Sequence, residues 1–149
     1  LRTDPVRSVA VPAAFVVGAV AVVTAVAVAG SGLGSLERYP TRALTMVGAS
    51  EPVISTDYVG NFRTALNGPK EAVFIDDRVD MYPRTVIEDY QTLLAGRAGW
   101  RAVLEDATAD WILWPADAPL TQILAGDEEW RPVYGDGAWA LFERRAGGN

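Results

Sequence analysis

The strongest hydrophobic pattern in the chain lies near its N-terminus. Residues 8–36 carry no charge, and residues 9–29 within them are almost entirely Val and Ala. A helix of these 21 residues, at about 1.5 Å of rise per residue, is long enough to cross a hydrocarbon core of about 30 Å. We therefore predict a transmembrane helix with a short flank over residues 1–30 and a flexible, glycine-rich linker over residues 31–38.

The charges beside the apolar run predict its orientation. Arg2 and Arg7 precede it, whereas the first charges after it are Glu37 and Arg38. Because basic residues near a membrane span stay on the cytoplasmic side, we expect a cytoplasmic N-terminus and an extracytoplasmic C-terminal domain in the cell membrane.

Three interpretations of this segment stay open. The A-x-A motif at residues 27–29 is typical of a cleavage site, although a signal peptide normally has a shorter apolar core. The chain also begins with Leu1 and not Met, which favours the last helix of a longer polytopic protein over a single-pass anchor. A helix made mainly of Val and Ala is only mildly apolar, and small residues let it pack against other membrane helices.

Beyond residue 38, short apolar runs alternate with segments of helical period. Asn67–Pro69 breaks the chain, and Gly135–Gly137 is typical of the turn of a β-hairpin. The segment 58–66 fits a helix and a strand equally well. The other predicted elements are helices at 39–47, 84–95, 99–105 and 119–125, and strands at 52–57, 72–75, 110–115, 130–134 and 139–142.

This order predicts the fold class. Strands that are joined by helices imply parallel crossovers, and a closing hairpin adds antiparallel strands at one side. We expect a small three-layer α/β domain over residues 39–145, with a mixed, mainly parallel sheet and a C-terminal β-hairpin. Residues 146–149 are expected to form a disordered tail.

Composition limits the kinds of catalytic and binding site that the chain can form. The chain has no cysteine and no histidine, which excludes thiolate metal sites and catalytic triads that use either residue within it. Without the first 30 residues, 11 of the 13 basic and 18 of the 19 acidic residues remain, a net charge of −7. Such a domain lacks the basic surface that binding to nucleic acid requires, so we expect no nucleic-acid partner.

An acidic loop after the predicted strand 72–75 is the candidate site. Acids at the carboxyl end of a strand lie where open α/β sheets bind ligands, and carboxylate oxygens suit a divalent cation such as Mg²⁺ or Mn²⁺. A purely structural interpretation stays open, in which an arginine pairs with the acids and fixes the loop. We name no catalytic residue and no definite metal ligand. The ligand-binding candidates are Asp57, Asp76, Asp77, Arg78, Asp80 and Tyr82.

The five tryptophans suggest sugar binding, since aromatic rings stack on pyranose rings. Trp111 and Trp114 lie three apart in one strand and are expected on opposite faces of the sheet. Packing in the core is the competing interpretation for the whole set.

The stretch from Val53 to Arg145 resembles the extracytoplasmic C-terminal domain that follows the last membrane helix in bacterial GT-C-type glycosyltransferase-like proteins. The resemblance covers about two-thirds of the chain. It rests on VFIDDRVDMYP (73–83), DY (89–90), GW (99–100), DWILW (110–114), PL (119–120), WRPVY (130–134) and ALFER (140–144).

The resemblance implies a polytopic membrane protein that uses polyprenyl-phosphate-linked sugars as donors. In that family the catalytic acid lies in an early extracytoplasmic loop, so this segment is expected to be a non-catalytic accessory or acceptor-binding domain. Its implied partners are the lipid bilayer, other membrane helices of the same or a partner chain, and a polyprenyl-phosphate sugar or glycan acceptor. The alternative is a single-pass, membrane-anchored envelope module for binding or assembly, without enzymatic activity.

Overall fold

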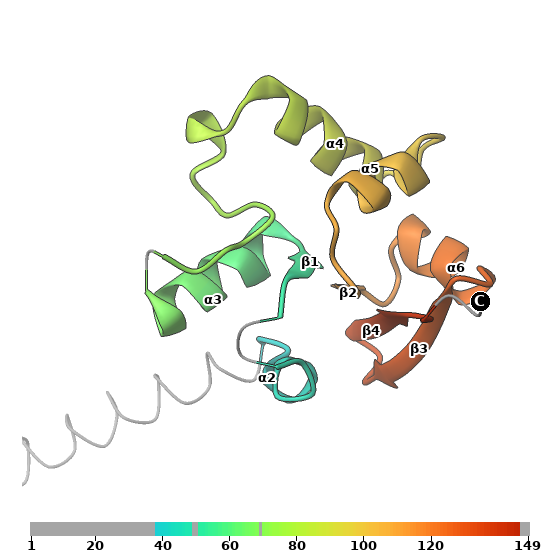
Figure 1. Ribbon diagram of the computed structural model, residues 1–149. Coiled ribbons are helices and arrows are strands. Elements are labelled where there is room, and N and C mark those ends of the chain that lie inside the picture. The colour runs from blue at the N-terminus through green and yellow to red at the C-terminus, as the bar shows by residue number, and fades with distance from the viewer. Residues whose placement is uncertain (1–37, 49–50, 69, 147–149) are drawn as a thin grey trace, which may run out of the picture. The chain divides into compact units, whose positions relative to one another are not determined.

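The computed structural model describes residues 38–48, 51–68 and 70–146 (Figure 1). The chain divides after Arg38 into two units, and every helix and strand of the described ranges belongs to the second. The transmembrane helix predicted over residues 1–30 lies outside the described residues, as do residues 31–37 of the linker and residues 147–149 of the tail. In the described ranges, no helix is long and apolar enough to cross a membrane.

A four-stranded mixed sheet organises the domain. Its strand order is β1-β2-β4-β3, with β1 and β2 parallel and the other two pairings antiparallel. The predicted small α/β domain with a mixed sheet and a C-terminal hairpin is thereby confirmed. The strands are β1 (Val53–Ser55), β2 (Trp111–Pro115), β3 (Trp130–Gly135) and β4 (Trp139–Arg144); the helices are α2 (Thr41–Leu44), α3 (Asp57–Asn67), the 3-10 turn η1 (Val79–Met81), α4 (Arg84–Leu94), α5 (Trp100–Asp106) and α6 (Pro119–Ala125).

The prediction of a mainly parallel sheet is wrong, because only one of the three pairings of described strands is parallel. The strand expected at 72–75 is an irregular segment that joins no sheet. It packs instead on α3, where a Cβ on Gly60 would lie 1.9 Å from the carbonyl oxygen of Ile75. Ile75 is fully buried, so the apolar run contributes a side chain to the core without pairing with a strand.

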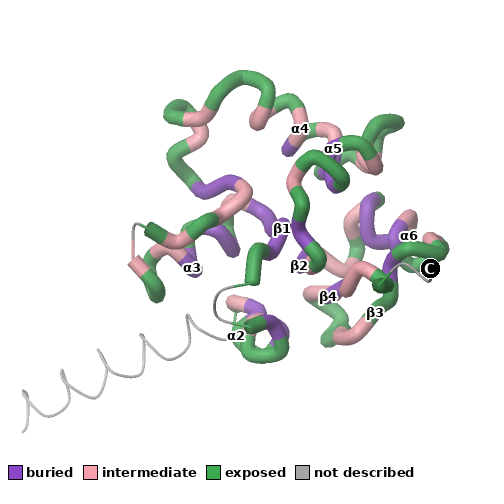
Figure 2. The backbone as a smooth tube through the Cα atoms, in the orientation of Figure 1, coloured by how far each residue is buried: buried purple, intermediate pink, exposed green. Residues whose placement is uncertain are grey.

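The two faces of the sheet carry separate core clusters. Alternation along the central strand sends Ile112 and Trp114 to one cluster and Leu113 to the other. Helices α4, α5 and α6 add side chains to the first cluster, whereas α2 and α3 add theirs to the second. Buried residues accordingly run through β1 and β2 and along one side of the helices (Figure 2).

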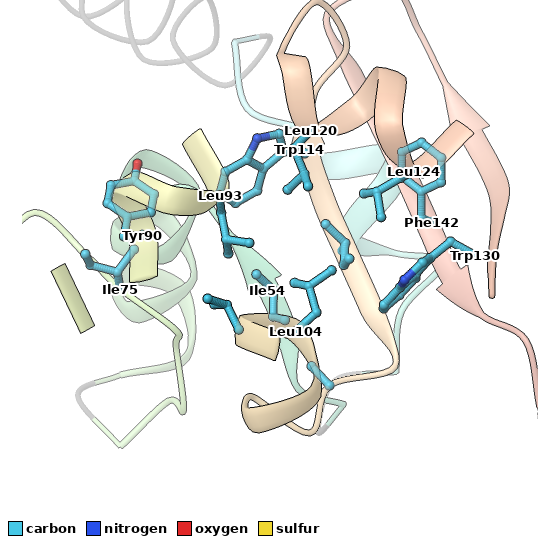
Figure 3. Packing of buried hydrophobic residues seen from close by; sticks show 13 residues of the cluster. Ile54, Ile75, Tyr90, Leu93, Leu104, Trp114, Leu120, Leu124, Trp130 and Phe142 are labelled. Atoms are coloured by element: carbon cyan, nitrogen blue, oxygen red, sulfur yellow. The ribbon is translucent and has the colours of Figure 1, made fainter. Parts of the chain in front are cut away.

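Tryptophan packing agrees with the predicted strand faces. Trp114 is fully buried and lies beside Leu93 and Leu120 in the larger cluster (Figure 3). Trp111 is half-buried and packs against the cluster on the other face. The expected opposite orientation of these two rings is confirmed.

Candidate functional site

Two loops meet at the carboxyl edge of the parallel strands. The register sets Ser55, the last residue of β1, opposite Leu113, and β2 ends two residues further on at the same edge of the sheet. After β1 the chain enters α3, which contributes Val59 to one core cluster; after β2 it enters α6, which contributes Leu120 to the other. Because neighbouring parallel strands are followed by helices on opposite faces, this edge is a topological switch point, where open α/β sheets bind ligands.

Asp57 lies at this edge, at the first position of α3. Its carboxylate Oδ1 accepts a hydrogen bond of 2.7 Å from the Tyr90 hydroxyl, and its backbone N–H donates to the same hydroxyl oxygen at 3.3 Å. Burial, together with the bond to Asp57, raises the pKa of Tyr90 above its ordinary value of 10.0. Tyr90 therefore stays protonated at neutral pH and acts as a permanent donor that fixes Asp57.

Three buried polar atoms near the same strand ends have no hydrogen-bond partner among the described residues. They are Ser55 Oγ, Thr56 Oγ1 and Trp114 Nε1. Thr56 occupies the N-cap position of α3, yet its hydroxyl makes no capping bond. Leaving a buried donor unsatisfied costs about 1–3 kcal/mol, and such groups are normally paired with ordered water or a ligand.

Parallel aromatic rings lie at this edge, on the side of the sheet that α3 covers. Tyr58 is 41% exposed, and its ring stacks on that of Tyr39, with ring centroids 4.4 Å apart. Trp139 pairs with Pro115 at the end of β2, and its ring lies parallel to that of Tyr58 at 6.5 Å. An aromatic surface that includes the exposed Tyr58 thus lies on the α3 side of this edge, whereas Tyr90 and Trp114 belong to the core cluster on the other side.

The acidic loop forms a separate cluster around Asp76. The Asp76 side chain is 1% exposed and accepts bonds from Arg78, with Nε 3.0 Å from Oδ2 and the backbone N–H 3.0 Å from Oδ1. These bonds hold the pKa of Asp76 below its ordinary value of 3.8, against the effect of burial, and Tyr82 adds a further hydrogen bond. The fork of Arg78 therefore fixes Asp76 at the base of the loop.

The remaining acids of the loop do not join this cluster. Asp77 and Asp80 are not part of the ion pair, which Arg78 makes with Asp76 alone among the described residues. Within the part of the chain that the structure describes, no three acidic side chains lie close enough to hold a metal ion. The arrangement of Asp76, Arg78 and Tyr82 supports the structural interpretation of the loop over a divalent-cation site.

Five residues at the sheet edge were missing from the predicted site. Thr56 directly follows β1, and Trp114 is the last residue but one of β2, so applying the strand-end rule to both parallel strands would have found them. Tyr90 lies 33 positions from Asp57 along the chain, and no local pattern predicts that pair. The complete set is Thr56, Tyr58, Tyr90, Trp114 and Trp139.

Comparisons with protein-family models, with curated proteins and with solved structures found no match.

Proposed function

We propose that residues 39–145 form the extracytoplasmic head of a membrane-bound, glycosyltransferase-like protein, and that this head binds a saccharide acceptor without catalysing its transfer. The catalytic acid and the site for the polyprenyl-phosphate-linked sugar would lie in membrane-embedded parts of the same or a partner chain. The resemblance of Val53–Arg145 to such heads and the apolar run at residues 9–29 are the sequence support.

The observation that carries the binding proposal is the set of polar and aromatic side chains at the sheet edge. Saccharides present an apolar ring face together with several hydroxyl groups. Tyr58 is 41% exposed, and its side chain offers the apolar contact. The Asp57 carboxylate, held by Tyr90, keeps acceptor capacity on its second oxygen for a sugar hydroxyl.

The state of the acids supports an accessory role. Asp76 is buried and paired with Arg78, so its carboxylate is not available as a general base. Asp57 accepts a hydrogen bond from Tyr90 on one oxygen and keeps the other as an acceptor. In the described domain these two acids serve as structural anchors and as hydrogen-bond acceptors.

A binding experiment tests the proposed site. The full chain in lipid nanodiscs is titrated with cellobiose and with chitobiose, and tryptophan fluorescence is recorded, because all five tryptophans lie at residues 100–139. Loss of the stacking contact in Tyr58→Ala is expected to weaken binding about fivefold, which corresponds to about 1 kcal/mol. Tyr82→Ala, in the acidic loop, is the matched control and is expected to bind as the parent chain does. Binding lost in Tyr82→Ala and kept in Tyr58→Ala would move the ligand to the acidic loop.

A second measurement tests the membrane enzyme itself. An immunoblot against the head, made on fractions of the source cells, gives the apparent mass and location of the native protein. A membrane band several-fold heavier than 149 residues is expected. A membrane band near 149 residues would favour the anchored module, and a smaller soluble band would indicate a cleaved signal.

A further inference from the structure

A groove lies between α2, with the residues that follow it, and the C-terminal half of α3. Its volume is about 580 Å³, within the range of pockets that bind small ligands. The walls are mainly apolar and include Leu44 and Val47 from α2 and the residues after it, and Phe62 and Leu66 from α3. Leu66 is 64% exposed, so part of this apolar wall faces solvent.

One buried cation lies in the wall of the groove. The Arg63 side chain belongs to a residue that is 5% exposed. Its Nη2 donates to the backbone oxygen of Glu51 at 3.3 Å and pairs with the Glu71 carboxylate. Its Nη1 is buried and has no partner among the described residues. Because Glu71 already balances the charge, Nη1 suits a neutral acceptor such as an ester carbonyl.

The position of the groove along the chain indicates where an occupant would come from. The apolar run ends at Ala29, and α2 begins 12 residues later at Thr41. Twelve residues reach at most about 43 Å when fully extended. If residues 9–29 cross the bilayer, this short linker tethers α2 and its groove to the membrane.

We propose that this groove holds the acyl chain of a membrane lipid, with the ester carbonyl of the chain accepting a hydrogen bond from Arg63 Nη1. The apolar walls match the chain, the single unpartnered donor matches the ester, and the preceding segment supplies the bilayer. The inference rests on the membrane attachment that is part of the proposed function.

Photo-crosslinking in liposomes tests the inference. The full chain is reconstituted into phosphatidylcholine vesicles that contain a phosphatidylcholine with a diazirine in its acyl chain. After irradiation, mass spectrometry locates the adducts. Adducts are expected within residues 9–29, from the bilayer, and also within residues 41–48 and 62–67, from the groove.

Two matched variants separate groove binding from chance labelling. Leu66→Asp places a charge on the exposed wall of the groove, whereas Leu94→Asp makes the same change at an exposed leucine of α4. Labelling of the groove is expected to fall about tenfold in Leu66→Asp and to stay unchanged in Leu94→Asp. Near-UV circular dichroism verifies that both variants keep their fold.

Each outcome decides the inference. Adducts on residues 9–29 with none in the groove would overturn it and leave the membrane attachment intact. Groove adducts that persist in Leu66→Asp, or that are lost equally in Leu94→Asp, would also overturn it. A chain that is labelled nowhere would overturn both the lipid site and the membrane attachment.

Discussion

Replacing Gly60 with alanine tests whether the close approach of α3 to residues 72–77 holds the acidic loop in place. An ideal Cβ on Gly60 would lie 1.9 Å from the Ile75 carbonyl oxygen and 3.0 Å from its carbonyl carbon. Real Cβ contacts essentially never fall below 3.0 Å, so helix and segment must separate by about 1.1 Å. The neighbouring atoms belong to the backbone and cannot rotate away.

The magnitude follows from two opposing terms. Forcing an extra carbon into a close-packed interior costs about 1–3 kcal/mol, and backbone contact puts Gly60→Ala at the upper end. Alanine in a helix interior is favoured over glycine by about 1 kcal/mol. The expected net loss of unfolding free energy is therefore about 2 kcal/mol, which lowers the urea midpoint by about 1 M.

The assay is urea unfolding of the full chain in detergent micelles, followed by tryptophan fluorescence. All five tryptophans lie beyond residue 99, so the signal reports on the α/β domain alone. Gly126→Ala is the matched control, because its nearest contact would be the Ile123 carbonyl oxygen at an ordinary 3.8 Å. It is expected to change stability by no more than about 0.5 kcal/mol. Equal midpoints for the two variants would refute the packing of α3 on Ile75.

Three further changes test the contacts of the site and of the groove by the same unfolding assay. Tyr90→Phe keeps the ring and removes both hydrogen bonds to Asp57, so a loss of about 1–2 kcal/mol is expected. Asp76→Asn is expected to lower the urea midpoint at neutral pH. Because the folded pKa of Asp76 is lowered, its stabilisation is present above about pH 3.8 and disappears as the pH falls through the folded value, where variant and parent converge. Glu71→Gln leaves the buried Arg63 guanidinium without its counter-charge and is expected to cost about 3 kcal/mol.

Each of these changes has a counterpart at an exposed position. Tyr134→Phe removes a hydroxyl bond to an exposed aspartate and is expected to cost less than Tyr90→Phe. Asp77→Asn, at an exposed position outside the ion pair with Arg78, is expected to leave the urea midpoint at neutral pH unchanged. Glu88→Gln breaks an exposed pair with Arg84 and is expected to cost no more than about 0.5 kcal/mol. A control variant that changes stability as much as the variant it is paired with would contradict the burial on which that prediction rests.

The predictable part of the fold is the part with a strong local period. The helix after Pro83 has its apolar residues on one face, and Tyr90 and Leu93 are buried there as that pattern requires. The glycines of its turn predict the closing hairpin. The conformation of segment 72–75 could not be predicted in the same way, because a short apolar run is compatible with a strand and with an irregular segment packed on a helix.

The site was predictable only in part, for a related reason. Asp76 and Arg78 are two positions apart, so their ion pair could be anticipated from the sequence. The pair of Asp57 and Tyr90 depends on the crossover from α3 to α4, which a local pattern does not specify. The unpartnered state of Trp114 Nε1 depends on every neighbour in the core, so it becomes visible only after folding.

Helix α3 explains why the segment 58–66 was ambiguous. Its first turn carries Asp57 and Tyr58 at the sheet edge, Gly60 contacts the segment before the acidic loop, and Leu66 lines the groove on its last turn. Val59 packs in the core cluster on the α3 side of the sheet. A helix whose sides contact four different surfaces cannot confine its apolar residues to one stripe, because each surface needs contact residues of its own. The weakness of the local pattern is therefore a consequence of the number of contacts this helix makes, and local rules are expected to fail most often where function is concentrated.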